Sequence, residues 1–461
     1  MQFIYRIECI VPEKLEKTYK IQNLENPKFP DSHDEIVALV TSNEVRKAIL
    51  AAQERYLPWQ EFREKSWVPG NKEQVWALLR IQRGANNKTT LIRDKSGKHY
   101  NFNPNSHSQF LHEVDLELGG AMLGISDFSE GGKRQIIRRN LIEESIASSK
   151  LEGANTSRDA ARRMLNEGHK PKDKDEQMIV NNHAVMKRIE EETKSELLSI
   201  VLLKDLHKQV TSGTLSDPAH EGEFRQTFDS KGQRLKIMPW DETTVAYVAP
   251  DREFVDEQLS LLIGFANDEN STDFVHPLFK AIMLHFWIGL LHPFEDGNGR
   301  LARILFYWYM LRKGYWAFSY LSLSEKILKS PKQYAMAYIY SEQDGCDLNY
   351  FIHYNINKLK LARDDLQKYL KQKIVENRQS LRLLQSGHNF NGRQLRLLQY
   401  LSKDEQRSTT VSSYHSINVD VGPVTVANDL KRLVQGEFLT KHKTGRNVFY
   451  YPTLKVRALF K

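Results

Sequence analysis

The sequence predicts a mainly α-helical protein. Its N-terminal region is predicted to be mixed α/β, and its C-terminal region to combine helices with two short strands. Three observations carry this prediction. Residues 276–291 are apolar on nearly every face, which predicts a buried helix. Residues 133–211 contain several long stretches with apolar residues at helical spacing, closed by glycines. Residues 392–461 instead predict helices followed by two short strands.

Length and composition indicate a soluble protein with several domains. The 461 residues carry 66 Lys and Arg against 58 Asp and Glu, a net charge of +8 that permits an acidic or nucleic-acid partner without requiring one. The two cysteines, Cys9 and Cys346, predict neither a disulfide framework nor a zinc site, so we expect a reducing compartment. Residues 1–20 lack the apolar core of a signal peptide, and no apolar stretch reaches the roughly 18–20 residues of a membrane span. We therefore expect a cytoplasmic protein without a membrane partner.

The first part of the chain, residues 1–115, is predicted to be mixed α/β. Residues 89–93 and 99–103 flank a turn at Gly97 and predict a hairpin. Three tryptophans lie near helical stretches, and we interpret them as packing residues rather than a ligand site: Trp59, Trp67 and Trp76.

A helical core is predicted for residues 116–370, before a linker at 371–391. Its first helix spans residues 133–152 and ends at Gly153, and further helices are expected at 157–168, 173–193 and 196–211. Residues 224–237 depart from the helical pattern of the preceding segments. They predict a β-hairpin with a glycine turn at Gly232.

The most informative segment, residues 292–303, is a predicted loop between two helices. It combines a titratable base, a carboxylate, two glycines around an amide and two arginines: His292, Asp296, Gly297, Asn298, Gly299, Arg300 and Arg303. The start of the second helix leaves backbone N–H groups unpaired, and glycine lets a phosphate approach them closely. The segment therefore predicts chemistry on a phosphate group.

Each of these residue types has a role in phosphoryl or nucleotidyl transfer. His292 is the expected general base, because histidine titrates near neutral pH. Asp296 is expected to hold Mg²⁺ against phosphate oxygens. Gly297, Asn298 and Gly299 form the predicted anion cradle. The guanidinium groups of Arg300 and Arg303, three residues apart on one helix face, suit phosphate oxygens. Phe294 is expected to pack in the core and Glu295 to face solvent.

This segment resembles the signature of Fic-domain proteins, H-x-F-x-[DE]-G-N-G-R-x-x-R, and matches every fixed position. Residues 276–278 and 222–225 are also similar to the family, and the resemblance covers roughly residues 110–360. It implies a helical domain that transfers AMP from ATP, with Mg²⁺, to a protein Ser, Thr or Tyr hydroxyl. It also implies that Arg303 holds the γ-phosphate, and that the β-hairpin is a flap that docks the target, with Lys236 and Ile237 as docking residues.

A second resemblance lies upstream, at the end of the helix predicted for residues 133–152. Ser148, Glu152 and Gly153 match the inhibitory motif [ST]-x-x-x-E-[GN] of one class of Fic proteins. The resemblance implies that Glu152 pairs with Arg303 and stops the γ-phosphate from seating. Ser148 and Glu152 are four residues apart, and hence on one helix face.

The C-terminal domain, residues 392–461, resembles a winged helix-turn-helix. Its second helix, near residues 422–434, carries polar and basic residues, and so does its wing: Thr425, Asn428, Lys431, Arg432, Lys443 and Arg446. These side chains could meet DNA phosphates. The same fold also serves protein interaction and dimerisation, so formation of a homodimer is an alternative role for this domain.

Together these features predict an autoinhibited protein adenylyltransferase, with modification of the enzyme itself as one outcome. A second interpretation keeps the site but changes the nucleotide donor, or runs the reverse reaction that removes AMP. A third makes the chain a nucleotide-sensing DNA-binding regulator, with the winged helix as its functional end.

Overall fold

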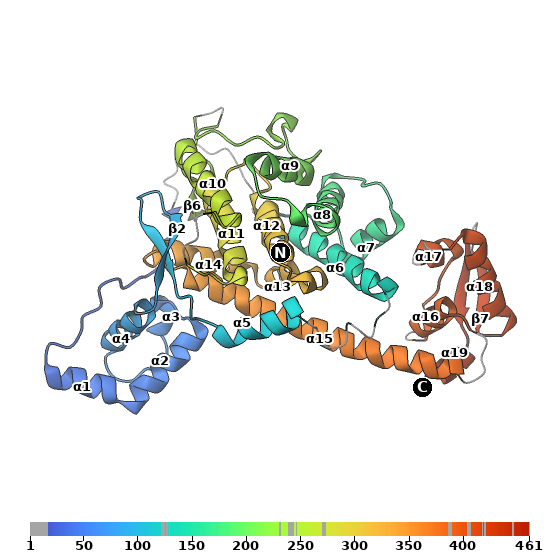
Figure 1. The fold of residues 1–461 in the computed structure, drawn as a ribbon, viewed down its shortest axis with the longest axis horizontal. Helices are drawn as coiled ribbons and strands as arrows, with labels where there is room; N and C mark the ends of the chain where they lie inside the picture. The colour runs from blue at the N-terminus through green and yellow to red at the C-terminus, as the bar shows by residue number, and fades with distance from the viewer. Residues whose placement is uncertain are drawn as a thin grey trace. The chain divides into compact units, whose positions relative to one another are not determined.

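The computed structural model divides into two compact units, which we describe separately. Unit 1 comprises residues 1–123, 131–157 and 171–363, and unit 2 comprises residues 124–130, 158–170 and 364–461. The structure describes residues 17–120, 125, 128, 130–229, 232–237, 244–245, 247–269, 273–385, 390–402, 407–416, 418, 421–444 and 447–460. Most of them lie in helices, so the predicted mainly α-helical class is confirmed (Figure 1).

Four helices and a hairpin lie in the first part of unit 1, after the short strand β1 (Lys17–Thr18). The helices are α1 (His33–Thr41), α2 (Asn43–Arg55), α3 (Trp59–Phe62) and α4 (Lys72–Gly84). The predicted hairpin is confirmed, since β2 (Lys88–Arg93) pairs antiparallel with β3 (His99–Phe102). Trp59 and Trp76 are buried in a core with Phe62, as expected of packing residues. Trp67 lies at the rim of this core and is 38% exposed.

The next helices include the four predicted between residues 133 and 211, now α6 to α9, and short helices that were not predicted. They are α5 (Ser108–Val114), the π-helix η1 (Asp115–Gly120), α6 (Glu130–Leu151), α7 (Arg158–Glu167), α8 (Lys174–Glu191), the 3₁₀ helix η2 (Thr193–Ser195), α9 (Ile200–Thr211) and the 3₁₀ helix η3 (Pro218–His220). α9 begins later than the predicted residue 196, because the Ser199 side chain caps it by accepting the N–H of Leu202.

The hairpin predicted at residues 224–237 was placed wrongly. Residues 224–228 form no strand, and the turn at Gly232 is closed by local bonds to Asp229. The strand β4 (Lys236–Ile237) exists but pairs antiparallel with β6 (Tyr247–Val248). We call residues 235–249 the flap; its residues 238–243 and 246 lie outside the described ranges. A strand of the flap, β5 (Thr244–Val245), pairs in parallel with β1 (Lys17–Thr18).

The core of unit 1 is built around two helices that pack side by side, α11 (Pro277–Leu291) and α12 (Asn298–Arg312) (Figure 1). Both are buried on nearly every face, which the apolar sequence predicted for α11. The surrounding elements are α10 (Arg252–Ala266), the 3₁₀ helix η4 (Trp316–Tyr320), α13 (Leu323–Leu328), α14 (Pro331–Gln343) and the long α15 (Asn349–Gln385). Residues 371–385 of the predicted linker therefore continue a helix.

Unit 2 contains helices and a two-stranded antiparallel sheet around its own core. Besides α7 these are α16 (Gly392–Leu401), α17 (Val411–Ser416), α18 (Pro423–Gln435), β7 (Leu439–Thr444), β8 (Asn447–Pro452) and α19 (Leu454–Leu459). Arg446 of the predicted wing lies outside the described residues. Within the described ranges of the chain, no helix has the length and apolar composition needed to cross a bilayer.

Candidate active site

His292 lies where α11 ends. Its backbone is left-handed, with φ 45° and ψ 60°, and its N–H still donates to the Ile288 carbonyl at 2.9 Å. The ring Nδ1 lies 2.7 Å from the Gly289 carbonyl, so Nδ1 must carry the proton and Nε2 the lone pair. Burial lowers the pKa of His292 to about 4, although the Gly289 hydrogen bond opposes the shift. The ring is therefore neutral near pH 7, with Nε2 as its basic atom.

Hydrogen bonds and buried packing within the loop after His292 hold its conformation. Phe294 is fully buried, as predicted. The Asn298 side chain accepts the Phe294 N–H at 3.0 Å and donates to the Phe294 carbonyl at 2.8 Å. The predicted cradle role of Asn298 therefore concerns its backbone, since its side chain closes the loop.

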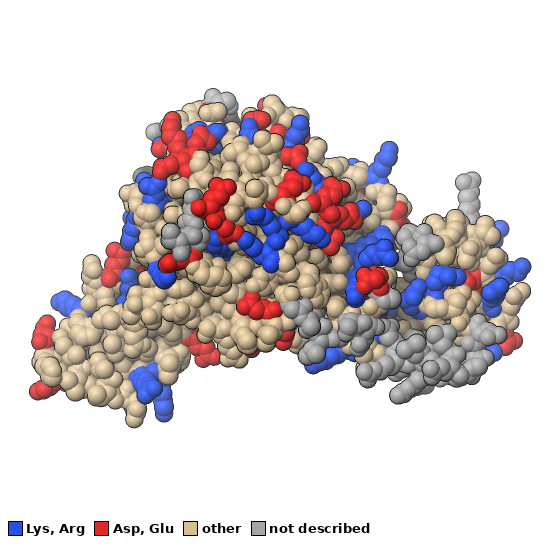
Figure 2. Space-filling model, viewed as in Figure 1, with Lys and Arg blue, Asp and Glu red and all other residues tan. Residues whose placement is uncertain are grey.

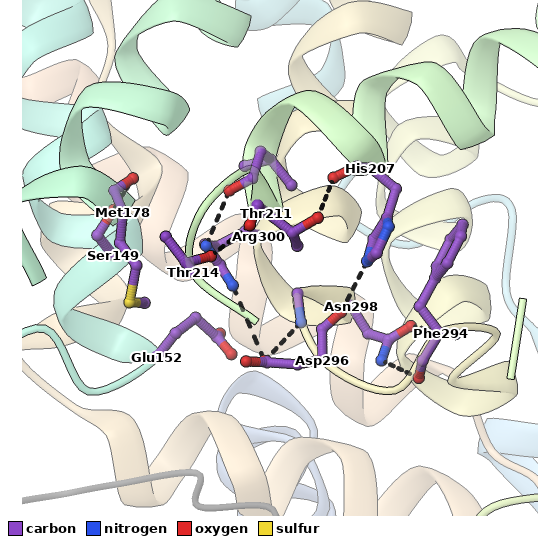
Figure 3. Close-up of polar contacts among 12 residues, drawn as sticks. Ser149, Glu152, Met178, His207, Thr211, Thr214, Phe294, Asp296, Asn298 and Arg300 are labelled. Atoms are coloured by element: carbon purple, nitrogen blue, oxygen red, sulfur yellow. Dashed lines mark hydrogen bonds and ion pairs between the residues drawn. The ribbon is translucent and has the colours of Figure 1, made fainter. Parts of the chain in front are cut away.

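A buried histidine on α9 supports the same loop. The His207 ring stacks on Phe294, with centroids 3.6 Å apart and planes 4° apart (Figure 3). Its Nδ1 accepts the Gly222 N–H at 3.0 Å, so its Nε2–H donates to the Asp296 carbonyl at 2.7 Å. Burial lowers the pKa of His207 to about 4, which keeps this pattern of donor and acceptor near neutral pH.

Two glycines shape the start of α12. Gly297 has φ 83°, and a Cβ there would lie 2.6 Å from Cγ2 of Thr211. A Cβ on Gly299 would collide with the carboxylate of Glu152. Glycine is therefore required for the turn at residue 297, and at residue 299 it lets a carboxylate approach the helix N-terminus.

Asp296 and Arg300 face each other across the loop (Figure 3). The Asp296 side chain is 39% exposed, its Oδ1 accepts the Gly297 N–H at 2.5 Å, and it lies 3.8 Å from Nη2 of Arg300. Arg300 is fully buried and donates from Nη1 to the Val210 carbonyl at 2.9 Å. In the described part of the chain, no hydrogen-bond acceptor is in reach of its Nε and Nη2. Arg300 thus has donors available for an anion at the loop.

Arg303 points to α6 instead. Its Nη2 donates to Oε1 of Glu152 at 2.9 Å and to the Ser148 carbonyl at 3.0 Å, and its Nε donates to Oγ of Ser148 at 2.9 Å. Burial lowers the pKa of Arg303, but the charge of Glu152, with smaller contributions from other groups, raises it overall. Gly153, with φ 97°, turns the chain away after Glu152. The Glu152 carboxylate therefore pairs with Arg303 and lies against Gly299, two residues of the predicted phosphate site.

Three further predicted residues lie at the edges of this arrangement. Lys236 and Ile237 form β4 of the flap and are half-buried. Glu295, expected to face solvent, is 44% exposed and forms an ion pair with His220.

Comparisons with known proteins agree with this geometry. Residues 197–310 match the model of the Fic/DOC family. The chain contains a Fic domain. Protein adenylyltransferase fic-1 of Caenorhabditis briggsae is 33% identical over 118 residues, which are 26% of this chain and 20% of that protein. Protein adenylyltransferase Fic of Culex quinquefasciatus is 30% identical over 122 residues, 26% of this chain and 21% of that protein. This chain thus spans about a fifth of the length of these relatives.

A solved structure supports the assignment of the fold. Fic-1 of Caenorhabditis elegans superposes on 72% of this chain and 85% of its own chain, with a TM-score of 0.50 and 19% sequence identity. At that identity the likeness indicates a shared fold and does not assign an activity.

The site of this Fic domain includes residues that the sequence analysis did not single out. The sequence around His207 does not indicate a role at the site, because a lone histidine in an amphipathic helix is more often an ordinary core residue. Arg225 lay within the family-like residues 222–225 but received no role. It is buried and donates to the His292 carbonyl at 2.6 Å.

Proposed function

We propose that this chain is a protein adenylyltransferase, which transfers AMP from Mg-ATP to a Ser, Thr or Tyr hydroxyl of a protein. The relatives matched by the Fic domain carry this activity in their names. The observation that carries the proposal is the loop of residues 292–303. It joins a neutral histidine, whose Nε2 is the basic atom, to the helix N-terminus and buried arginines that suit phosphates.

The proposed reaction uses these groups as follows. Nε2 of His292 takes the proton of the acceptor hydroxyl while its oxygen attacks the α-phosphorus of ATP. The bond from the α-phosphorus to the oxygen that bridges to the β-phosphate breaks, and pyrophosphate leaves with the electron pair. The N–H groups at the start of α12, with Arg300 and Arg303, hold the phosphates.

Asp296 fits the role of magnesium ligand. It offers hard carboxylate oxygens and is 39% exposed at the mouth of the loop. Mg²⁺ is commonly held by one or two carboxylates with phosphate oxygens and water. When bound, the ion would neutralise phosphate charge.

We further propose that Glu152 inhibits the enzyme. Its carboxylate lies against Gly299 and pairs with Arg303, so it occupies the position proposed for the γ-phosphate. ATP can seat all of its phosphates only when this carboxylate leaves.

Intact-mass analysis of Glu152→Gly incubated with ATP and a cell lysate tests the proposal. We expect protein masses raised by one AMP on a target, on the enzyme itself, or on both. Parallel incubations with GTP, CTP and UTP test the use of another donor, and incubation of the AMP-modified protein without nucleotide tests removal of AMP. No covalent nucleotide under any of these conditions would refute a transferase.

Unit 2 favours a second function, duplex DNA binding. On α18, four residues with polar or basic side chains are exposed while the opposite face is buried: Thr425, Asn428, Lys431 and Arg432. Lys441 and Lys443 are exposed on β7. Figure 2 shows several basic side chains and fewer acidic ones among the other residues on the visible described surface of unit 2. Such an exposed helix, together with the two lysines of β7, suits a major groove and flanking phosphates.

Fluorescence anisotropy with a labelled duplex at two salt concentrations tests this second function. Lys431→Ala and Arg432→Ala should each weaken binding and reduce the salt slope by about one unit. Lys455→Ala is the control, because Lys455 pairs with Glu437 in the same unit. Binding that does not depend on salt, or equal losses in the control, would exclude DNA recognition by α18 and favour a dimerisation module.

A further inference from the structure

Arg225 joins three segments of unit 1 through backbone carbonyls. It is 5% exposed. Its Nε donates to the His292 carbonyl at 2.6 Å, and its Nη2 donates to the carbonyls of Pro250 at 2.9 Å and Leu291 at 3.3 Å. Its Nη1 donates to the Gln226 carbonyl at 3.1 Å. One planar guanidinium group thus connects the end of α11 to the chain that leaves the flap.

The residue held in this way has a strained backbone. His292 is not glycine, yet its φ is 45°, a left-handed conformation that few non-glycine residues adopt and that costs conformational energy. Three contacts impose it here: the backbone N–H to Ile288, the ring Nδ1 to Gly289, and the carbonyl that accepts from Arg225. Of these, only the bond from Arg225 comes from outside α11 and its cap.

The link to the flap is short. β6 ends at Val248, two residues before Pro250, whose carbonyl accepts from the same Nη2 group as that of Leu291. The backbone N–H of Arg225 also donates to the Pro293 carbonyl at 3.0 Å. The residue that follows the flap, Pro250, and the first residue of the loop, His292, therefore bond to the same side chain.

We infer that Arg225 is a positioning residue, which holds His292 in its strained conformation and keeps the flap in register with Nε2. This inference rests on the proposed function, because it takes His292 as the base and the flap as the docking site for the acceptor. An acceptor segment bound at β4 then presents its hydroxyl to a histidine whose position is set by the same arginine.

The chemistry of the position requires arginine. Four carbonyls in different directions need several donors spread over a rigid plane, whereas lysine offers three donors from one nitrogen. A cation beside the last carbonyls of α11 is also favoured by the helix dipole. Burial lowers the pKa of Arg225 to about 10, which still leaves it charged near pH 7.

The test compares Arg225→Lys and Arg225→Gln with Arg234→Lys and Arg234→Gln, all in the Glu152→Gly enzyme. Arg234 is the matched control, because it lies beside the flap but is partly exposed and pairs with Asp251. AMP incorporation from α-labelled ATP gives kcat and KM, calorimetry gives the Kd for ATP, and a melting curve monitors folding. The rate of carbethoxylation of His292 by diethylpyrocarbonate, followed by mass spectrometry, reports the freedom of its ring without requiring activity.

We expect both Arg225 variants to lose about 10²-fold in kcat, the effect of a misplacement near 1 Å. The KM and Kd for ATP should stay near the parent values, and carbethoxylation of His292 should become faster. Arg225→Lys should fold and restore little activity, and the Arg234 variants should change none of these quantities.

A parallel fall in melting temperature, ATP affinity and kcat, with His292 carbethoxylated at the parent rate, would show a purely structural arginine and overturn the inference. If the Glu152→Gly parent itself incorporates no AMP, the proposed function fails. The carbethoxylation rates still decide whether Arg225 restrains His292.

Discussion

Replacing Glu152 by glycine should activate the proposed adenylyltransferase. The Glu152 side chain is largely buried, with 12% of its surface exposed. Its carboxylate lies 2.9 Å from Nη2 of Arg303 and against Gly299. A hydrogen bond to a charged group contributes about 1.5–3 kcal/mol. If ATP must displace this bond to seat its γ-phosphate, the competent state is depleted by about 10- to 150-fold. Glu152→Gly should therefore raise transfer at low ATP by about that factor.

AMP incorporation from α-labelled ATP, measured over a range of ATP concentrations, is the assay. Adding Arg303→Ala to Glu152→Gly should abolish the gain, because the released arginine is also the one proposed to bind the γ-phosphate. Glu167→Gly is the matched control: Glu167 also precedes a glycine with positive φ at a helix end, but it pairs with His169 in unit 2. A folded Glu152→Gly protein that is no more active than wild type would refute autoinhibition. A loss of melting temperature without a larger stabilisation by ATP would instead indicate a structural ion pair.

The remaining predictions concern the loop of residues 292–303. His292→Ala should reduce transfer by about 10²–10⁴-fold while calorimetry shows ATP binding nearly unchanged; near-normal transfer would remove His292 from its role. Because burial lowers the pKa of His292 to about 4, the base stays deprotonated as pH falls from 7 to about 5, and the rate should drop only as protonation sets in below that, not near pH 6.5. Asp296→Ala should weaken ATP binding only when Mg²⁺ is present, and an unchanged magnesium dependence in calorimetry would place the ion elsewhere. Gly297→Ala should cost about 1–3 kcal/mol in chemical denaturation, because its Cβ would meet Thr211 and its φ is positive; wild-type stability would contradict the close packing.

The parts of the site that are contiguous in sequence could be predicted, because short-range spacing determines them. The apolar run of α11, the glycines at the start of α12 and the order of residues from His292 to Arg303 all belong to this kind. The spacing of Arg300 and Arg303 predicted one shared helix face. In the structure Arg300 contacts α9 through Val210, whereas Arg303 contacts α6 through Ser148, because long side chains at neighbouring positions reach different elements.

The parts that depend on distant partners could not be predicted. His207 lies 89 residues from Asp296, whose carbonyl accepts from it, and nothing in its local pattern indicates that contact. The flap was misplaced for the same reason. The turn at Gly232 is a local feature and was visible, but the pairing of Ile237 with Tyr247 depends on which later segment supplies the partner strand.

The central claim is that His292 drives transfer of the α-phosphoryl group with its adenosine. The most direct measurement incubates Glu152→Gly, alone and combined with His292→Ala, with ATP labelled either at the α-phosphate or at the γ-phosphate, and counts the covalent label on protein. The account predicts that only the α-label becomes covalent, that the γ-label leaves as pyrophosphate, and that the double variant incorporates neither. Covalent γ-label would show phosphoryl transfer instead, and undiminished α-label in the double variant would show that the base lies elsewhere.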